Sequence, residues 1–203
     1  MKRSEVADSV SRETLSRLDC FATLLIRWNP SINLIAKADE GQLWERHIAD
    51  CVQLAEFLNP RPERGIDLGS GAGFPGLILA IAAGIPFELL EADHRKAAFL
   101  REAARETSAP VRVHGKRIEE VGIPPAPLVT ARALAPLPKL LRLAFPFLAP
   151  GGVCLFMKGR AVETELTDST CEWHMRVERI KSRTALDGSI LRISDLRRVA
   201  LSD

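Results

Sequence analysis

The residues with the clearest chemical meaning form a glycine-rich turn that follows a short apolar run. The turn, Gly69–Gly73, comes directly after Ile66–Leu68 and precedes Phe74–Gly76. Glycine tolerates positive φ and has no side chain, so such a turn lets a ligand approach the backbone closely. Open parallel sheets bind ligands at the carboxyl ends of their strands. A strand over Gly65–Leu68 would therefore place this turn at a binding edge.

An acidic residue, Glu91, ends the next apolar run, Phe87–Leu90. In nucleoside-binding α/β folds, an acid at this place accepts hydrogen bonds from the two hydroxyls of a ribose. Gly71–Gly76 also matches the G-x-G-x-x-G fingerprint of dinucleotide sites, but Phe74-Pro75 fills the point where a pyrophosphate would meet the helix. The chain has no tyrosine, which excludes a hydride-transfer site of the Tyr/Lys type. We expect a nucleoside ligand, and the alternative is a turn with a purely structural role.

Short apolar runs and helix signals alternate from Gly65 onward, as is typical of a doubly wound parallel sheet. We expect helices that begin near Pro75 and near Asp93, a good N-cap residue, and a third over Pro138–Leu148. The apolar runs predict strands over Gly65–Leu68, Phe87–Leu90, Val111–His114, Leu128–Ala131 and Gly152–Met157.

The two ends of the chain depart from this alternation. At the C-terminal end, Trp173–Lys181 and Ser189–Ser194 are β-like and flank Asp187-Gly188, a strong hairpin signal. At the N-terminal end, apolar periodicity predicts a helix over Val6–Trp28, stopped by Asn29-Pro30, and a second helix over Glu40–Leu58. We predict one α/β domain over 1–203. Residues 1–60 form a small helical cap, and 61–203 form a parallel sheet closed by an antiparallel hairpin.

Composition excludes several classes of protein. Hydrophobic residues at 46% and charged residues at 27% are typical of globular domains and exclude a disordered chain. The four cysteines form no C-x-x-C pair, so we expect neither a metal site nor a disulfide framework. The charged start lacks the apolar region of a signal peptide, and the longest uncharged stretch is interrupted by glycine and proline. We expect a cytoplasmic protein with no membrane contact.

The distribution of charge is more informative than the net charge of +2. No acidic residue occurs between Glu120 and Glu163, and that stretch contains Arg132, Lys139, Arg142, Lys158 and Arg160. If these cations converge on one face, they could bind a phosphate backbone. The alternative is a solvated surface of mixed charge.

The glycine turn with Glu91 resembles the site of class I S-adenosylmethionine (SAM) methyltransferases. A series of ordered blocks narrows the resemblance to the ribosomal small subunit methyltransferase G family, also called glucose-inhibited division protein B. Glu91 stands where that family usually has Asp. The blocks are Trp28-Asn29 with Asn33-Leu34, Arg46–Asp50, Asp67–Gly76, Arg117–Glu120, Thr130–Ala133 and Met157–Gly159.

The resemblance implies a class I SAM-dependent methyltransferase fold and methylation of guanine N7 in 16S rRNA, at position 527 in rRNA numbering. The expected partner is 16S rRNA or the small-subunit particle, and the expected state is a monomer. Gly71, Gly73 and Glu91 are the cofactor contacts that the turn itself suggests. Further cofactor contacts follow from the resemblance alone and are Gly69, Phe74, Ile118, Glu119 and Arg132.

Guanine N7 carries a free lone pair, so its methylation needs no general base, and we assign no catalytic residue. The main demand on the protein is alignment of the reactants. Arg132 is interpreted as a cofactor or phosphate contact, with a salt bridge to Glu91, Asp67 or Glu119 as the alternative. His47 is interpreted as a core histidine, and Lys158 either contacts RNA or ends a solvated strand. The i, i+4 spacing of Arg46 and Asp50 predicts no more than an ion pair on a helix surface. Two other functions stay open: SAM-dependent methylation of a small molecule or protein, and a non-catalytic nucleoside- or RNA-binding module.

Overall fold

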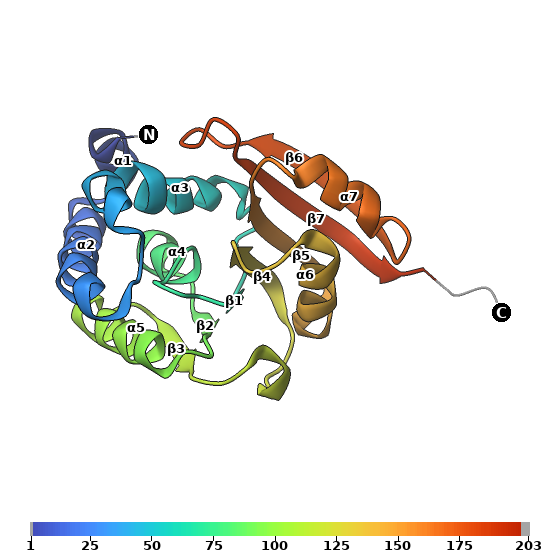
Figure 1. The fold of residues 1–203 in the computed structure, drawn as a ribbon, viewed down its shortest axis with the longest axis horizontal. Coiled ribbons are helices and arrows are strands. Elements are labelled where there is room, and N and C mark those ends of the chain that lie inside the picture. Colours follow the sequence, from blue (N-terminus) through green and yellow to red (C-terminus); the bar gives the residue numbers. More distant parts are fainter. Residues whose placement is uncertain (1, 200–203) are drawn as a thin grey trace.

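The apolar runs become strands of one seven-stranded sheet in the computed structural model, which describes residues 2–199 (Figure 1). The strand order is β3-β2-β1-β4-β5-β7-β6, with β1 to β5 parallel and the β6–β7 hairpin antiparallel. The order reverses between β1 and β4, which is where open α/β sheets bind ligands. The strands are β1 (Gly65–Leu68), β2 (Phe87–Leu90), β3 (Val111–His114), β4 (Ala126–Arg132), β5 (Leu148–Lys158), β6 (Trp173–Lys181) and β7 (Ser189–Arg198).

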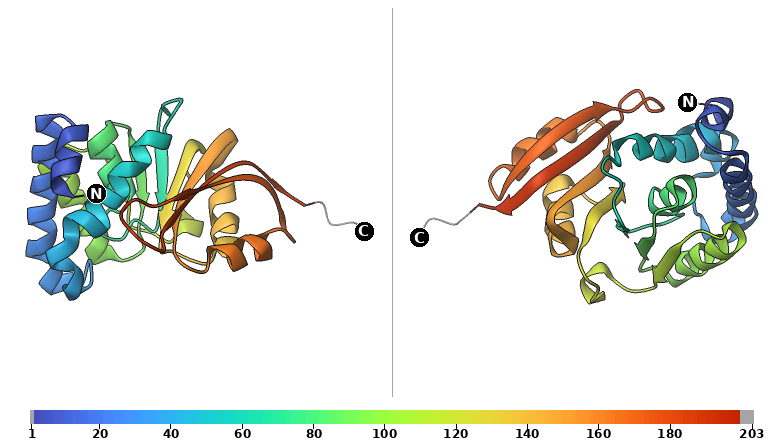
Figure 2. Two further views of the ribbon diagram at one scale, coloured as in Figure 1. Left: turned by 90° about the horizontal axis from the view of Figure 1, so that it is seen from above. Right: turned by 180° about the vertical axis from the view of Figure 1, so that it is seen from behind.

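Helices cover both faces of the sheet (Figure 2). Alternate residues of a strand point to opposite faces, so Leu89 belongs to the core under the N-terminal helices and Leu90 to the core on the opposite face. No helix within residues 2–199 has both the length and the apolar character needed to cross a membrane. Between and beyond the strands lie α4 (Gly76–Ala83), α5 (His94–Thr107), η4 (Ile118–Glu120), α6 (Leu137–Ala144), η5 (Phe145–Phe147) and α7 (Val162–Ser169).

The predicted fold class, a parallel sheet with a C-terminal hairpin, is confirmed. The bounds of β1, β2 and β3 are those predicted. Asp93 caps α5, because its carboxylate accepts the backbone N–H groups of Arg95 and Lys96. The predicted hairpin is also present, with its strands on either side of Asp187-Gly188.

The N-terminal segment predicted as one helix over Val6–Trp28 forms two helices, α1 (Arg3–Ser9) and α2 (Arg12–Ile32). Ser11 separates them as the N-cap of α2, and its hydroxyl accepts the backbone N–H of Thr14 at 3.1 Å. Side chains of α2 share one buried core with those of α4 and α5. The N-terminal helices therefore pack on the sheet's own helical layer.

The predicted stop at Asn29-Pro30 is wrong, because Pro30 lies inside the last turn of α2. A proline there removes one backbone hydrogen bond, and the helix ends at Asn33 in a left-handed conformation with φ 50°. The buried Asn29 side chain fixes the path of the chain just after the helix α2. Its amide donates to Glu40 at 2.7 Å, and its carbonyl accepts the backbone N–H of Ile35 at 2.9 Å.

The predicted regular helix over Glu40–Leu58 is also wrong. The chain forms four short turns of differing type: the 3-10 turn η1 (Lys37–Gln42), the π-helical turn η2 (Trp44–Ile48), α3 (Ala49–Val52) and the 3-10 turn η3 (Gln53–Phe57). The carbonyl of Arg46, within the π-helical turn, accepts a hydrogen bond from Arg132 at 3.0 Å. π-Helical turns often mark functional sites. The apolar stripe predicts helix but does not reveal a polar partner that comes from a distant strand.

Further differences lie in the second half of the chain, where β4 and β7 extend beyond the predicted Leu128–Ala131 and Ser189–Ser194. The helix α6 ends before the predicted Leu148, because η5 follows it and β5 begins at Leu148 rather than at Gly152. An irregularity in the pairing of β4 with β5 accommodates the extra residues. The helix α7 was not predicted, since its apolar face amounts to little more than Val162 and Leu166.

Candidate functional site

The glycine loop after β1 leaves its backbone open at Gly71. Gly69, Gly71 and Gly73 all have positive φ, of 64°, 56° and 95°. A Cβ atom at Gly73 would lie 3.0 Å from Leu77, so that glycine is required by packing. A Cβ atom at Gly71 would meet nothing closer than the carbonyl oxygen of Gly69, at 3.8 Å. Gly71 therefore presents bare backbone to open space, as a close ligand approach requires.

Glu91, directly after β2, is hydrogen-bonded to the backbone of the glycine loop. One carboxylate oxygen accepts the backbone N–H of Gly71 at 2.7 Å, and the other accepts the backbone N–H of Asp93 at 2.8 Å. An ionised carboxylate has about four acceptor positions, so two remain for further donors. Glu91 lies where the sequence predicts a ribose contact, and it also contacts the loop directly.

Asp67, the last residue but one of β1, is fully buried beneath the loop. One of its carboxylate oxygens accepts the hydroxyl of Thr130 at 2.6 Å, and the other has no hydrogen-bond partner among the described residues. Burial raises the pKa of Asp67 to about 6. Asp67 is absent from the predicted site residues, although it is the first residue of the D-x-G-x-G-x-G pattern that the glycine loop follows.

Phe74 points into the protein rather than out of the loop. Its ring stacks on His47 at 5.1 Å between centroids and meets Phe21 edge-on at 5.7 Å. The guanidinium of Arg132 lies 5.6 Å from the centroid of the same ring. The side chain of Phe74 therefore joins the glycine loop to the segments that carry His47 and Arg132. A ligand contact by Phe74 rests on its backbone.

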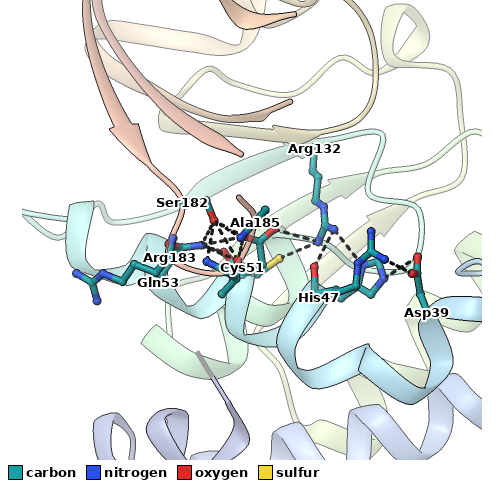
Figure 3. Close-up of polar contacts among 11 residues, drawn as sticks. Asp39, His47, Cys51, Gln53, Arg132, Ser182, Arg183 and Ala185 are labelled. Atoms are coloured by element: carbon teal, nitrogen blue, oxygen red, sulfur yellow. Dashed lines mark hydrogen bonds and ion pairs between the residues drawn. The ribbon is translucent and has the colours of Figure 1, made fainter. Parts of the chain in front are cut away.

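His47 is a largely buried neutral histidine. Burial, together with the nearby charge of Arg132, lowers its pKa to about 4, against the opposing effect of the carboxylate of Asp39. Nδ1 of His47 lies 3.0 Å from the donor Nη2 of Arg132, and Nε2 faces Asp39 at 3.6 Å (Figure 3). The interpretation of His47 as a core histidine agrees with its burial, but only Nδ1 is hydrogen-bonded, and Nε2 has no hydrogen-bond partner among residues 2–199.

Arg132, at the end of β4, points toward the turns η2 and α3, which carry His47 and Cys51 (Figure 3). Besides His47 and the carbonyl of Arg46, it contacts the thiol of Cys51 at 3.8 Å and the carboxylate of Asp50 at 3.7 Å. Its side chain is 21% exposed. Arg132 therefore forms an ion pair, but with Asp50 rather than with the predicted Glu91, Asp67 or Glu119. A cofactor or phosphate contact by Arg132 stays a prediction.

The remaining predicted cofactor contacts lie in η4, the turn after β3. Ile118 is half-buried and packs against the core on the α6 side of the sheet, and Glu119 is exposed. The parallel register of β1, β2 and β3 brings their carboxyl ends together at one edge of the sheet. An apolar residue and a carboxylate therefore follow the third strand at the edge where the glycine loop and Glu91 follow the first two.

A cavity of about 700 Å³ lies farther along the same edge, beside Arg132. This volume is within the range of small-molecule sites. Arg132, Lys158 and Arg160 line it from β4, β5 and the loop after β5, and the residues around the β6–β7 hairpin loop line it from the other side. The glycine loop is not part of its lining. The glycine loop and this cavity therefore lie next to each other at the carboxyl edge of the sheet.

The five predicted RNA-binding cations do not converge on one patch. Lys158 is 9% exposed and pairs with Glu165 at 2.5 Å, so it is neither a solvated strand end nor an unpaired cation. Arg160 is 86% exposed and pairs with Asp187 across the mouth of the cavity. Lys139 and Arg142 lie on α6 and line no part of the cavity.

These groups suit alignment of reactants better than covalent catalysis. Burial raises the pKa of Cys51 to about 12, so this thiol stays protonated near neutral pH. His47 is already occupied by Arg132. Bare backbone at Gly71, a carboxylate at Glu91 and a cation at Arg132 are groups that bind and orient a polar ligand.

Comparison with known proteins gives a consistent result. A model of the family described as rRNA small subunit methyltransferase G matches residues 14–190. Two curated relatives, both named ribosomal RNA small subunit methyltransferase G, are each 53% identical to this chain. The relative from Gluconobacter oxydans aligns over 94% of this chain and 98% of its own length. The relative from Rhodospirillum centenum aligns over 95% and 89%.

Solved structures with low identity share the fold. A putative O-methyltransferase from Klebsiella pneumoniae is 16% identical, with a TM-score of 0.59 over 88% of this chain and 89% of its own. An O-methyltransferase from Bacillus cereus is 14% identical, with a TM-score of 0.59 over 86% and 90%.

Proposed function

The chain belongs to the rRNA small subunit methyltransferase G family, and we propose that it transfers a methyl group from SAM to guanine N7 of 16S rRNA, at nucleotide 527. The family match extends over residues 14–190 and so includes both the glycine loop and the cavity. The observation that carries the proposal is the open backbone of Gly71 beside the carboxylate of Glu91.

The residues of the loop fit a SAM molecule. An added Cβ at Gly71 would enter open space, which is the space that a ligand resting on the loop backbone needs. The free acceptor positions of Glu91 suit the two ribose hydroxyls. Gly69 and Gly73 shape the loop, and Phe74 anchors it through its buried ring. Ile118 and Glu119 supply an apolar contact and a carboxylate for the adenine, and Arg132 closes the side next to the cavity.

SAM, when bound, supplies a methyl group already activated by a sulfonium. The lone pair of guanine N7 would form the new bond to the methyl carbon while the methyl–sulfur bond breaks and its electron pair stays on sulfur. No proton leaves N7, so the protein needs no general base. The residues of this chain have to align guanine N7 with the methyl group of SAM. When the chemical step itself is easy, this alignment is the main way in which a protein accelerates it. The paired state of His47 and the high pKa of Cys51 agree with a site that contains no base or nucleophile.

The cavity beside Arg132 is the proposed entry for the target nucleotide. Arg132, Lys158 and Arg160 line it, paired with Asp50, Glu165 and Asp187 of the same cavity, and each would exchange its carboxylate for a phosphate of the RNA. Lys139 and Arg142 lie apart from the cavity on α6 and would meet phosphates there. Phosphate contacts of this kind supply most of the affinity of nucleic-acid-binding proteins. We propose that a monomer acts in the cytoplasm on 16S rRNA, either free or within the small-subunit particle.

The test is the fate of a labelled methyl group. The purified chain is incubated with methyl-labelled SAM and, in parallel, with small-subunit particles, extracted 16S rRNA, total protein and a small-molecule extract. We expect label in 16S rRNA, recovered as 7-methylguanosine after digestion to nucleosides. Label in protein or small molecules alone would identify a different methyltransferase. No transfer, with normal SAM binding, would identify a non-catalytic binding module.

A further inference from the structure

Asp50 is a buried carboxylate that faces donors from separate parts of the chain. It lies in α3, is 6% exposed and was expected to form no more than a helix-surface ion pair with Arg46. That expectation is wrong, because Arg46 pairs with Asp39 instead, at 2.8 Å. A carboxylate taken out of water is strongly destabilising unless donors surround it. The donors around Asp50 therefore indicate what this residue organises.

One carboxylate oxygen of Asp50 holds the loop of the β6–β7 hairpin. It accepts hydrogen bonds from Ser182 at 2.9 Å, from Gln53 at 2.8 Å and from the hydroxyl of Thr184. The Ser182 oxygen in turn accepts the backbone N–H groups of Thr184 and Ala185, each at 3.2 Å. Side chains of the N-terminal segment thus set the backbone of a loop more than 120 residues away (Figure 3).

The other carboxylate oxygen faces Arg132 at 3.7 Å. The remaining contacts of Arg132 are neutral: the carbonyl of Arg46, the imidazole of His47, the thiol of Cys51 and the ring of Phe74. Within residues 2–199, Asp50 is the carboxylate that the structure pairs with this guanidinium. One buried charge therefore fixes Arg132 on one side and the hairpin loop on the other.

Arg132, Asp50, Ser182 and Thr184 all line the cavity of about 700 Å³. Asp50 thus holds together two walls of the cavity that come from different ends of the sequence. Buried ion pairs add little to stability compared with apolar packing, and they are better explained where a defined geometry is needed. We propose that Asp50 is a positioning residue for methyl transfer, which holds Arg132 and the loop 182–188 so that the target nucleotide enters a preformed cavity. The proposal rests on the proposed function of this site.

The test compares three variants with the wild type in steady-state methylation of small-subunit particles, with SAM affinity measured by calorimetry. Rates are divided by the fraction of molecules that bind SAM, so that loss of folded protein does not count as loss of function. Asp50→Asn keeps the shape of the side chain and removes its charge. We expect kcat to fall at least 10-fold and SAM affinity to fall by no more than 3-fold, because the glycine loop and Glu91 are unchanged and Arg132 is one proposed cofactor contact among several.

The double variant Ser182→Ala/Thr184→Val releases the loop and leaves the Asp50 charge in place. We expect its KM for particles to rise at least 5-fold, with kcat within 2-fold of the wild type. Glu56→Ala is the matched control, because Glu56 pairs with Arg183 of the same loop at the protein surface and does not contact Asp50. We expect this control to stay within 2-fold of the wild type in both constants.

A double-mutant cycle with Arg132→Lys distinguishes a positioning role of Asp50 from a general loss of structure. If Asp50 acts through Arg132, the Asp50→Asn/Arg132→Lys variant is no slower than the slower single variant. Multiplied losses, or Asp50→Asn with kcat within 3-fold of the wild type, would overturn the proposal. If Asp50→Asn yields no folded protein, the double variant Ser182→Ala/Thr184→Val is the test instead. An unchanged KM for particles in that variant would overturn the proposal. A wild type that methylates no rRNA would instead refute the proposed function.

Discussion

The glycine loop and the Asp50–Arg132 cluster lie next to each other but are built in opposite ways. The loop uses backbone and one carboxylate, with Gly71 and Glu91 only 20 residues apart. The cluster uses side chains, and its partners are separated by up to 134 residues. A site made of local backbone is specified by a short sequence motif. A site made of distant side chains exists only after folding, so the two regions differ in what a substitution in each should disturb.

The largest effect is expected from Gly71→Val. Its side chain would occupy the space in which the ligand meets the backbone, so SAM binding should fall beyond the range that calorimetry detects, at least 100-fold. The left-handed φ of 56° also strains a β-branched residue, by about 1–2 kcal/mol. Thermal melts with and without SAM separate the two effects.

Gly151→Val is the matched control for this variant. Gly151 has φ 73°, and an added Cβ there would meet no atom within 4 Å. The strain should be similar, but the residue lies outside the glycine loop, so SAM affinity should stay normal. Equal loss of SAM binding in both variants would mean that strain, and not ligand space, explains the result.

The second-largest effect is expected at Glu91, whose carboxylate accepts the backbone N–H of Gly71 in the glycine loop. Charge-assisted hydrogen bonds to ribose are worth roughly 1.5–3 kcal/mol, so Glu91→Ala should weaken SAM binding about 10- to 100-fold. Glu91→Gln should recover part of this loss, and Glu91→Asp should be mild. Since Glu91 also accepts the N–H groups of Gly71 and Asp93, Glu91→Ala should lower the melting temperature of the ligand-free protein by a few degrees. Calorimetry of the three variants would refute the ribose role if Glu91→Ala bound SAM like the wild type.

The pH dependence of stability should have opposite signs in the two regions. The folded pKa of Asp67, about 6, lies above its ordinary value of 3.8, so its contribution to stability is present below pH 3.8 and is lost as pH rises through 6. The folded pKa of His47, about 4, lies below its ordinary value of 6.5, so its contribution is present above pH 6.5 and is lost as pH falls through 4.

Urea unfolding between pH 4 and 7 tests this contrast. Asp67→Asn should lose stability more steeply than the wild type on acidification, by up to about 3 kcal/mol, because it lacks the proton that Asp67 gains on folding. His47→Gln should lose stability less steeply than the wild type over the same range. Parallel curves for all three proteins would show that neither group titrates as its burial indicates.

The smallest effects are expected from the exposed cations. Arg142 already pairs with Glu172 at 2.7 Å, whereas no described residue pairs with the exposed Lys139. If α6 meets rRNA phosphates, Lys139→Ala should reduce the slope of log affinity against log salt by about 1. Arg142→Ala should reduce it less, because Arg142 must leave Glu172 to bind a phosphate. Filter binding at several salt concentrations would contradict this order if Arg142→Ala had the larger effect.

The contrast between the two regions also explains how much the sequence could predict. The bounds of β1, β2 and β3, the cap at Asp93 and the hairpin at Asp187-Gly188 follow from local patterns, and the structure confirms them. Local patterns report on backbone preference and on burial of a single face. They are sufficient to locate the glycine loop, because that loop is defined by its own backbone.

The same patterns could not reveal partners that folding brings together. The stripe over Glu40–Leu58 predicts a regular helix, but the bond from Arg132 to the carbonyl of Arg46 accompanies a π-helical turn. The i, i+4 spacing of Arg46 and Asp50 predicts a surface pair, whereas Asp50 is buried against Ser182. No local rule specifies a partner in another strand or loop, so the second region had to be found in three dimensions.

The most direct test of the central claim is the mapping of N7-methylguanosine in 16S rRNA at single-nucleotide resolution. Small-subunit particles that lack the modification are incubated with SAM and either the wild type, Gly71→Val or Gly151→Val. Borohydride reduction and aniline treatment then cleave the extracted rRNA at N7-methylated guanines. We predict one new cleavage, at nucleotide 527, with the wild type and Gly151→Val and none with Gly71→Val. Cleavage at another guanine, or no cleavage despite transfer of label to the rRNA, would contradict the account.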